Sequence, residues 1–478
     1  MQSVVMKFGG SSVVDAAAID RVIAIVAGQQ ARGRAPVVVV SALGGVTDTL
    51  LALAQAARAG NAAEVRDGVD GLLARHRDQA DRLGAGSDAA LHAALDSIAG
   101  ELRTVLDSIQ RQRANDHRAL DAVAATGELL SSRLVAAALS ARGSAAAWID
   151  ARDVVRTDDR YTCAAPQIEA LNEQAQAVVS PIIAAGTVAV LGGFIGRAPD
   201  GSTTTLGRGG SDYSASLVGA ALGASEIQIW TDVDGMLTAD PRIVYDAEVV
   251  PHLSFAEASE LAYFGAKVLH PSTIFPAVSR NIPVRILNSR RPEAPGTLIT
   301  ADPPAGNRPF AALACKRGIT VIDITSTRML MAHGFLRRVF EAFEINETPV
   351  DVVTTSEVSV SVTIDDNRRG PDIVASLLEI GEVSVEEQMA ILTVVGDRLA
   401  TNSTLAARII GAMTGFPLRM ISQAASRKNV TIVLPEASLA PAMMHLHREL
   451  FPASAKASAG KPAVALMGDP ARGADSAR

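Results

Sequence analysis

The sequence predicts an α/β fold, a three-layer αβα sandwich with a mainly parallel sheet, followed by two smaller units of ferredoxin-like order. Two observations predict it. From Val4 to about Thr300, short apolar runs alternate with longer Ala-rich helical stretches, which is typical of βαβ units. Beyond a Pro-rich break, strand and helix patterns follow an order that is repeated once.

The first part contains five apolar runs of strand length. Their continuous apolar character is typical of parallel strands that are buried on both faces. The runs are 4–6, 37–40, 188–191, 227–230 and 284–287. The charged, Ala-rich segment 58–119 predicts a helical hairpin beside the sheet.

The second part begins after 301–309, where three prolines and a glycine predict a linker. Residues 357–365 alternate between apolar and polar side chains, as expected for a strand with one buried face. We predict these domains: 1–300, a linker at 301–311, first and second ferredoxin-like units at 312–383 and 384–451, and a disordered tail at 452–478. In that tail, 463–467 is apolar enough to supply a closing strand to the last unit.

Composition narrows the class of protein. The net charge of −7 leaves no general basic surface for nucleic acid or an anionic membrane. The two cysteines, Cys163 and Cys315, lie far apart without metal-ligand spacing, so we expect no disulfide framework, no protein-held metal and a reducing cytoplasm. The uncharged segment 174–196 is interrupted by Pro and Gly, and we expect a helix and a strand there rather than a membrane span.

The first candidate site follows the first strand, at 7–12. Gly9 and Gly10 allow the backbone to approach a ligand closely, and Lys7 adds a cation at the same place. The segment therefore predicts a phosphate site, with a simple tight turn as the alternative. It is not a Walker P-loop, since the sequence has no GxxxxGK[ST] string.

The second candidate site is the glycine-rich segment 203–213. We expect Ser211 to cap a helix that has Asp212 in its first turn, and helix N-termini bind anions. Arg208, expected to be buried among glycines and hydroxyls, can bind a carboxylate through two parallel hydrogen bonds. A capped helix after a flexible loop is the alternative.

Three further features are more ambiguous. The acidic loop 230–242 follows a strand and can hold nucleotide hydroxyls or Mg²⁺-bound water, or can simply form turns. Lys267 is a lone cation in an apolar setting, so it is either functional or a surface lysine. Glu128, at an apparent helix start, either complements the helix dipole or binds an ammonium group.

Six segments together resemble the aspartate kinases: KFGGSS, VVVSALGGVTD, ATGELLSS, TTTLGRGGSDYSA, WTDVDGMLTADPR and FGAKVLHP. The resemblance covers about 4–451 and implies an amino-acid-kinase fold followed by two ACT domains. It also implies ATP, Mg²⁺ and L-aspartate as ligands, and phosphorylation of the aspartate side-chain carboxylate.

Residue roles follow from the same resemblance. The catalytic residues are expected to be Lys7, Arg208 and Asp212. The aspartate-binding residues are expected to be Thr47, Glu128, Arg208, Gly209, Gly210 and Ser211. The nucleotide is expected to contact Lys7, Phe8, Gly9, Gly10, Thr231, Asp232, Leu237, Arg242, Lys267 and Val268. Leu237 replaces a tyrosine that family members often carry near the adenine.

The second part resembles the regulatory segments of the family. A lysine or threonine effector is expected to contact Met329, Phe335, Leu336, Val350, Asp351, Thr355 and Ser356. Ala332 and Pro349 replace serines of some lysine-inhibited relatives, so the effector stays open. ACT domains pair between chains, which predicts a homodimer or a larger homo-oligomer. Two alternatives remain: an acetylglutamate or glutamate 5-kinase of the same fold, and a non-catalytic amino-acid-sensing subunit.

Overall fold

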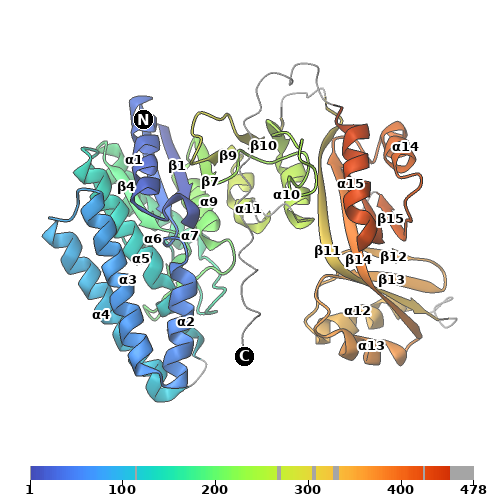
Figure 1. The fold of residues 1–478 in the computed structure, drawn as a ribbon, viewed down its shortest axis with the longest axis horizontal. Helices are drawn as coiled ribbons and strands as arrows, with labels where there is room; N and C mark the ends of the chain where they lie inside the picture. The colour runs from blue at the N-terminus through green and yellow to red at the C-terminus, as the bar shows by residue number, and fades with distance from the viewer. Residues whose placement is uncertain are drawn as a thin grey trace, which may run out of the picture.

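The computed structural model describes residues 2–113, 116–265, 271–303, 308–326, 333–423 and 426–452. Its first half is built on an eight-stranded sheet of order β3-β4-β2-β1-β7-β9-β10-β8 (Figure 1). Neighbouring strands run parallel, except that β10 is antiparallel to β9. The strands are β1 (Gln2–Phe8), β2 (Arg34–Val40), β3 (Ala146–Ile149), β4 (Val188–Gly192), β7 (Glu226–Thr231), β8 (His252–Ser254), β9 (Val284–Asn288) and β10 (Thr297–Thr300).

Helices cover both faces of this sheet, which confirms the three-layer prediction. Val5 and Val37 pack with α9 on one face, whereas Val4 and Val38 pack with α1 on the other. The helices are α1 (Ala16–Ala31), α2 (Val46–Ala59), α3 (Ala62–Arg82), α4 (Ala89–Gln112), α5 (His117–Ala141), α6 (Ala151–Val154), α7 (Ile168–Gln174), α8 (Ser180–Ala184), α9 (Gly210–Leu222), α10 (Phe255–Tyr263) and α11 (Pro271–Ser279). Shorter elements are η1 (Gly10–Ser12), the π-helical turn η2 (Ala175–Val179) and the hairpin β5 (Ile195–Arg197) with β6 (Thr203–Thr205).

All five predicted strands are present, and α3 and α4 form the predicted hairpin. The segment 174–196 is divided between short helices and β4. Within the described residues, α5 is long and apolar enough to cross a membrane, but 83% of its most apolar window is buried in the protein. Buried helices of globular cores pass the same test. The predicted tail strand at 463–467 lies outside the described residues.

The second half is one six-stranded antiparallel sheet of order β12-β13-β11-β14-β16-β15. Its strands are β11 (Phe310–Thr325), β12 (Val353–Thr355), β13 (Ser359–Ile364), β14 (Glu382–Gly396), β15 (Met420–Gln423) and β16 (Asn429–Pro435). Its helices are α12 (Phe335–Ile345), α13 (Gly370–Leu378), α14 (Ser403–Ala412) and α15 (Glu436–Leu450).

The pairing of these strands differs from two tandem units. Residues 320–325 of β11 pair with β13 in the first unit, whereas 310–316 pair with the part of β14 that belongs to the second unit. The second unit therefore takes one strand from residues 310–316, of which we had assigned 310–311 to the linker and 312–316 to the first unit. Because β11 and β14 run through both units, the units share a continuous sheet.

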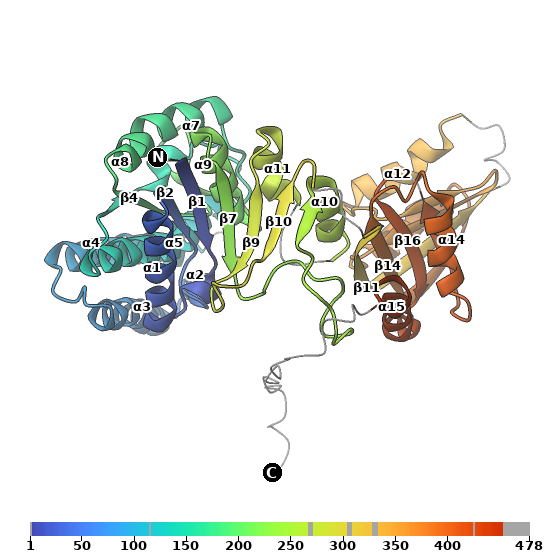
Figure 2. The same ribbon diagram turned by 90° about the horizontal axis from the view of Figure 1, so that it is seen from above.

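The two halves of the chain meet along α10 and β11 (Figure 2). Leu313 N–H donates to the Thr238 carbonyl at 2.7 Å, and the Thr238 hydroxyl lies 2.9 Å from His447 Nε2. Gly265 has φ +112°, and a Cβ there would lie 2.2 Å from the Cys315 carbonyl oxygen. Glycine is therefore required at this close approach.

Candidate active site

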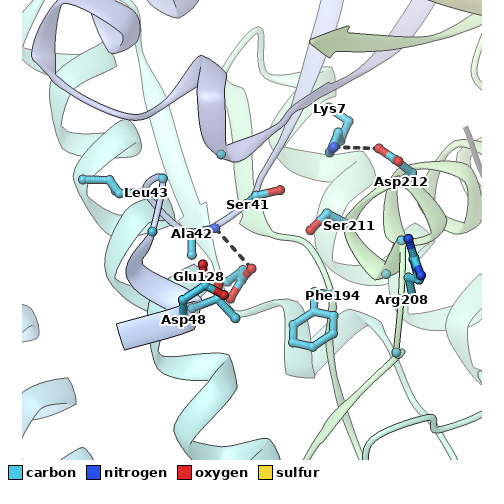
Figure 3. A pocket seen from close by; sticks show the side chains of 17 residues that line it. Lys7, Ser41, Ala42, Leu43, Asp48, Glu128, Phe194, Arg208, Ser211 and Asp212 are labelled. Carbon is cyan, nitrogen blue, oxygen red and sulfur yellow. Dashed lines mark hydrogen bonds and ion pairs between the residues drawn. The ribbon is translucent and has the colours of Figure 1, made fainter. Parts of the chain in front are cut away.

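A cavity of about 420 Å³ lies where β1 and β2 end beside the beginning of α9 (Figure 3). Ligands of open α/β sheets bind beyond the carboxyl ends of strands, which is where this cavity lies. It is lined by Lys7, Gly10, Ser41, Ala42, Leu43, Gly44, Gly45, Thr47, Asp48, Glu128, Phe194, Gly207, Arg208, Gly209, Gly210, Ser211 and Asp212. The three predicted catalytic residues and all predicted aspartate-binding residues are therefore brought together.

Lys7 and Asp212 form an ion pair at one side of the cavity. Lys7 Nζ lies 2.7 Å from Asp212 Oδ1, and the two side chains are only 12% and 16% exposed. Gly10 lines the same side, where a Cβ would lie 3.2 Å from the Ala42 carbonyl oxygen. The cation is thus held beside a backbone segment that has no side chain to exclude an anion.

Glu128 lies across the cavity, in the middle of α5 rather than at a helix start, so our placement of it was wrong. Its side chain is buried, and one carboxyl oxygen accepts the Ala42 N–H at 3.1 Å. Its Oε2 has no partner among the described residues. Burial raises the pKa of Glu128 to about 8, although the Ala42 hydrogen bond and the Lys7 charge act in the opposite direction.

The glycine-rich segment approaches from a third side. Gly207 and Gly209 have φ +74° and +72°, a conformation that glycine adopts without strain. Helix α9 begins at Gly210 with Gly209 as its N-cap, so Ser211 lies in the first turn and is not the cap we predicted. Arg208 is exposed rather than buried, which corrects that prediction too, and no other described residue pairs with its guanidinium.

Sequence reasoning missed several lining residues. Phe194 has φ +69°, a left-handed conformation that is uncommon for a non-glycine residue. Its ring packs so closely on α9 that a Cβ at Gly210 would lie 2.6 Å from Phe194 Cδ2. The other missed residues are Ser41, Ala42, Leu43, Gly44, Gly45 and Asp48, whereas Gly207 belongs to the predicted glycine-rich segment. The glycine pair after β2 was the available signal for the first five of them.

The predicted nucleotide residues are more dispersed. Thr231 ends β7, beside β1, and Asp232 and Leu237 follow it in the loop. Arg242 is paired with Asp240 at 2.6 Å and points to solvent, with 78% of its side chain exposed. None of these four lines the cavity. Lys267 and Val268 lie outside the described residues.

The Phe8 side chain is not available to a nucleotide. It is fully buried and stacks on Trp230, with ring centroids 5.9 Å apart. Only its backbone can contact a ligand. Gly9 N–H donates to the Trp230 carbonyl at 3.3 Å, so the backbone at this place is already fixed to β7.

The predicted effector residues lie in different environments. Phe335 is 2% exposed in the core of the first regulatory unit, whereas Leu336 is 41% exposed. Val350 is half-buried, and Thr355 and Ser356 are exposed. Met329 and Ala332 lie outside the described residues, and Pro349 is exposed.

Asp351 connects this segment to the catalytic half. Lys316 Nζ lies 2.6 Å from Asp351 Oδ1 and 3.2 Å from Asp365 Oδ2. The same ammonium lies 4.7 Å from the centre of the Tyr263 ring, at the end of α10. A change at Asp351 therefore has a direct physical route to α10.

The comparisons with known proteins agree with the fold. The model of the amino acid kinase family matches residues 2–288, and an ACT-domain model matches 392–450. The chain belongs to the amino acid kinase family.

Within that family, the relatives it resembles over nearly its whole length are aspartokinases. It is 37% identical to lysine-sensitive aspartokinase 3 of Escherichia coli, over 94% of this chain and 99% of that protein. It is 36% identical to the chloroplastic aspartokinase 1 of Arabidopsis thaliana, over 94% of this chain and 80% of that protein. A crystal structure of E. coli aspartokinase III with aspartate and ADP, in the R-state, matches with a TM-score of 0.79 at 36% identity, covering 94% and 100% of the two chains.

Proposed function

We propose that this chain transfers the γ-phosphate of ATP to the side-chain carboxylate of L-aspartate, giving 4-phospho-L-aspartate and ADP. This reaction is the first step toward lysine, threonine and methionine, and we place it in the cytoplasm. The observation that carries the proposal is one cavity that combines Lys7, Glu128 and Arg208 in a chain of the aspartokinase type.

Aspartate needs a site for two carboxylates and one ammonium group. The exposed Arg208, with the backbone at 209–211, is the proposed partner of a carboxylate, since a guanidinium binds it with two parallel hydrogen bonds. Thr47 and Glu128 complete the pocket. The free Oε2 of Glu128 is the proposed acceptor for the ammonium group.

The transfer itself needs no general base, because the attacking side-chain carboxylate carries no proton to be removed. A carboxylate oxygen forms the bond to the γ-phosphorus, and the bond from that phosphorus to the oxygen of ADP breaks. The catalytic requirements are in-line placement and neutralisation of negative charge. Lys7 is the proposed cation at the transferred group, with Asp212 holding its ammonium in place.

The nucleotide is proposed to bind beyond the ends of β1 and β7, with Gly9 and Gly10 at its phosphates. Thr231, Asp232, Leu237, Arg242, Lys267 and Val268 are the proposed remaining contacts. Among the described residues, no cluster of three or more His, Cys, Asp or Glu side chains could hold a metal ion. We propose that Mg²⁺ is bound through the substrate phosphates and water together with one or two carboxylates, as is usual for this ion.

The second half is proposed to regulate the enzyme by binding lysine or threonine. Support comes from the E. coli relative, which is named as a lysine-sensitive aspartokinase. The structure of E. coli aspartokinase III with lysine and aspartate, in the T-state, also matches, with a TM-score of 0.74 at 35% identity. A homodimer or larger assembly is proposed to form through this half. The first unit exposes several apolar side chains that an assembly would cover: Leu336, Phe340, Ile345, Val358 and Leu378.

The test is ATP- and Mg²⁺-dependent formation of an acyl phosphate from L-aspartate, trapped with hydroxylamine, with and without lysine and threonine. Aspartyl hydroxamate is the expected product, and inhibition by one amino acid identifies the effector. Product from glutamate or acetylglutamate instead would move the assignment to a related kinase. Product from none of them would favour a sensing subunit.

A further inference from the structure

Asp121 holds two separate segments of the catalytic half on α5. Its side chain is 1% exposed, and its Oδ2 accepts the backbone N–H groups of Thr162 and Thr205, each at 2.9 Å. Its Oδ1 accepts the Thr205 hydroxyl at 2.7 Å. The two segments are forty-three residues apart in the chain, so one carboxylate fixes both to the same helix.

These segments form the base of the loop that carries Arg208. Thr205 ends β6, and Arg208 follows three residues later. Between them, Gly207 packs against the other segment, since a Cβ there would lie 3.3 Å from the Thr162 carbonyl oxygen. The Ala164 N–H also donates to the Thr205 carbonyl at 2.9 Å.

Helix α5 thereby positions residues on two sides of the cavity. Glu128 lies seven residues after Asp121, which is about two helical turns, so both side chains project from similar faces of α5. Glu128 contributes directly to the cavity wall, whereas Asp121 does not line the cavity and instead accepts hydrogen bonds from the base of the glycine-rich loop. Arg208 has no ion-pair partner in the described part of the chain, so its position depends on the backbone that Asp121 fastens.

We infer that Asp121 is a positioning residue for aspartate binding, acting through the Thr205–Arg208 backbone. The inference rests on the proposed role of Arg208. A displacement of about 1 Å at a substrate contact can lower the rate about 10²-fold, so a distant anchor of this kind has a measurable effect on the reaction.

The test compares Asp121→Ala with Asp121→Asn. The asparagine oxygen can accept both backbone N–H groups, and its amide can donate to the Thr205 hydroxyl, so Asn keeps all three bonds without the charge. We expect Asp121→Ala to raise the KM for aspartate about tenfold or more, with the KM for ATP within about twofold. For Asp121→Asn, the KM values for aspartate and for ATP should both stay within about threefold of those of the parent chain.

A milder variant and a matched control keep the inference testable if Asp121→Ala does not fold. Thr205→Val removes the Oδ1 bond alone and should raise the aspartate KM with little effect on the ATP KM. The control is Thr204→Val on the same strand, which removes a buried 2.7 Å contact with the Thr157 hydroxyl and does not touch Asp121. It should lower the unfolding temperature and leave the aspartate KM unchanged.

A double variant connects Asp121 to Arg208. If Asp121 acts through Arg208, adding Asp121→Ala to Arg208→Ala should raise the aspartate KM much less than it does in the parent chain. Three results would overturn the inference. The first is a double variant in which the effects of Asp121→Ala and Arg208→Ala on the aspartate KM are fully additive. The others are equal rises in both KM values for Thr205→Val and an unchanged aspartate KM for a folded Asp121→Ala. An inactive parent chain would instead contradict the proposed function itself.

Discussion

Lys7 Nζ lies 2.7 Å from Asp212 Oδ1, and this ion pair joins the end of β1 to the first turn of α9. A carboxylate at a helix N-terminus is favourable in itself, and here it also fixes the only lysine that lines the cavity in the described part of the chain. An ammonium group that is fixed before the phosphate arrives needs little reorganisation during phosphoryl transfer.

Lys7→Met is expected to lower kcat by about 10²–10³-fold, the usual effect of removing one charge-stabilising donor from an active site. The KM for aspartate should change by less than about threefold, because Lys7 is assigned to the transferred phosphate. Asp212→Asn keeps a hydrogen-bond acceptor beside the Lys7 ammonium, so it should lower kcat less than Lys7→Met does. Steady-state hydroxamate assays measure kcat and the aspartate KM for both variants. A kcat for Lys7→Met within about threefold of that of the parent chain would show that Lys7 does not act in the chemical step.

Aspartate binding should be linked to the ionisation of Glu128. With a pKa of about 8, the free enzyme holds this carboxyl protonated at pH 7, whereas a bound ammonium group favours the carboxylate. The Kd for aspartate should therefore weaken about tenfold for each pH unit below about 8. Calorimetry in buffers of different ionisation enthalpy should detect release of about one proton at pH 7. Glu128→Gln should bind weakly at every pH and release none, and proton release by that variant would contradict the assignment.

The same group should reduce the stability of the fold at higher pH. The folded-state pKa of about 8 exceeds the ordinary glutamate pKa of 4.5, so the unfolded chain ionises first as the pH rises. Stability should fall between about pH 4.5 and 8, by about 1.4 kcal/mol for each unit of pKa difference. Glu128→Gln does not titrate, so its unfolding temperature should exceed that of the parent chain at pH 8 and match it near pH 4.5. An advantage that does not vary with pH would argue for a packing effect instead.

The sequence was most informative where local backbone requirements carry the site. The glycines next to Lys7 and Arg208 mark close backbone approaches, and both residues line the cavity. Our placement of Glu128 at a helix start rested on Gly127, which precedes it in the sequence, and was wrong. In the folded chain Gly127 lies within α5, where a Cβ would be only 2.7 Å from the Ala42 Cβ. The glycine is needed for tertiary packing, which a single sequence does not reveal.

The continuous sheet of the second half was missed for a related reason. Strand β11 shifts its register between Lys316 and Ile319, around Gly318 with φ +69°. This irregularity interrupts the apolar alternation, so the sequence pattern does not reveal that 310–325 form one continuous strand. Phe194 could not be predicted either, because its position depends on β4 and α9 meeting in space.

His76 should make the stability of the fold sensitive to acid, independently of Glu128. It is fully buried on α3, its Nδ1 lies 2.7 Å from the Leu72 carbonyl oxygen, and its Nε2 has no partner among the described residues. Burial lowers the pKa from 6.5 to about 4, so stability present above pH 6.5 is lost as the pH falls toward 4. The loss should approach about 3 kcal/mol.

Replacing His76 by leucine should remove that pH dependence. Urea unfolding between pH 4 and 7 measures it, and the control His92→Leu, at a partly exposed site on α4, should retain it. Because His76 does not line the cavity, the kinetic constants at pH 7.5 should not change. An identical loss of stability on acidification in His76→Leu would assign the step to other groups.

Lys316→Met should separate effector binding from inhibition. Lys316 contacts both Asp351, a proposed effector residue, and the Tyr263 ring at the end of α10. An effector ammonium that binds Asp351 would compete with Lys316 and so alter its contact with the catalytic half. Without the lysine, the effector should still bind by calorimetry, but the maximal inhibition of the kinase should decrease. Allosteric coupling is typically worth about 1–3 kcal/mol, so a fivefold or larger change in the inhibited rate is expected.

The matched control for that variant is Arg419→Met. Arg419 forms ion pairs with Asp323 and Glu386 on the same sheet, and none of its described ion pairs reaches the catalytic half. Arg419→Met should leave both effector binding and inhibition nearly unchanged. Tyr263→Ala should behave like Lys316→Met, because it removes the ring that the Lys316 ammonium contacts. Full inhibition of Lys316→Met with normal effector binding would show that the signal reaches the active site by another route, such as the Thr238–His447 contact between the two halves.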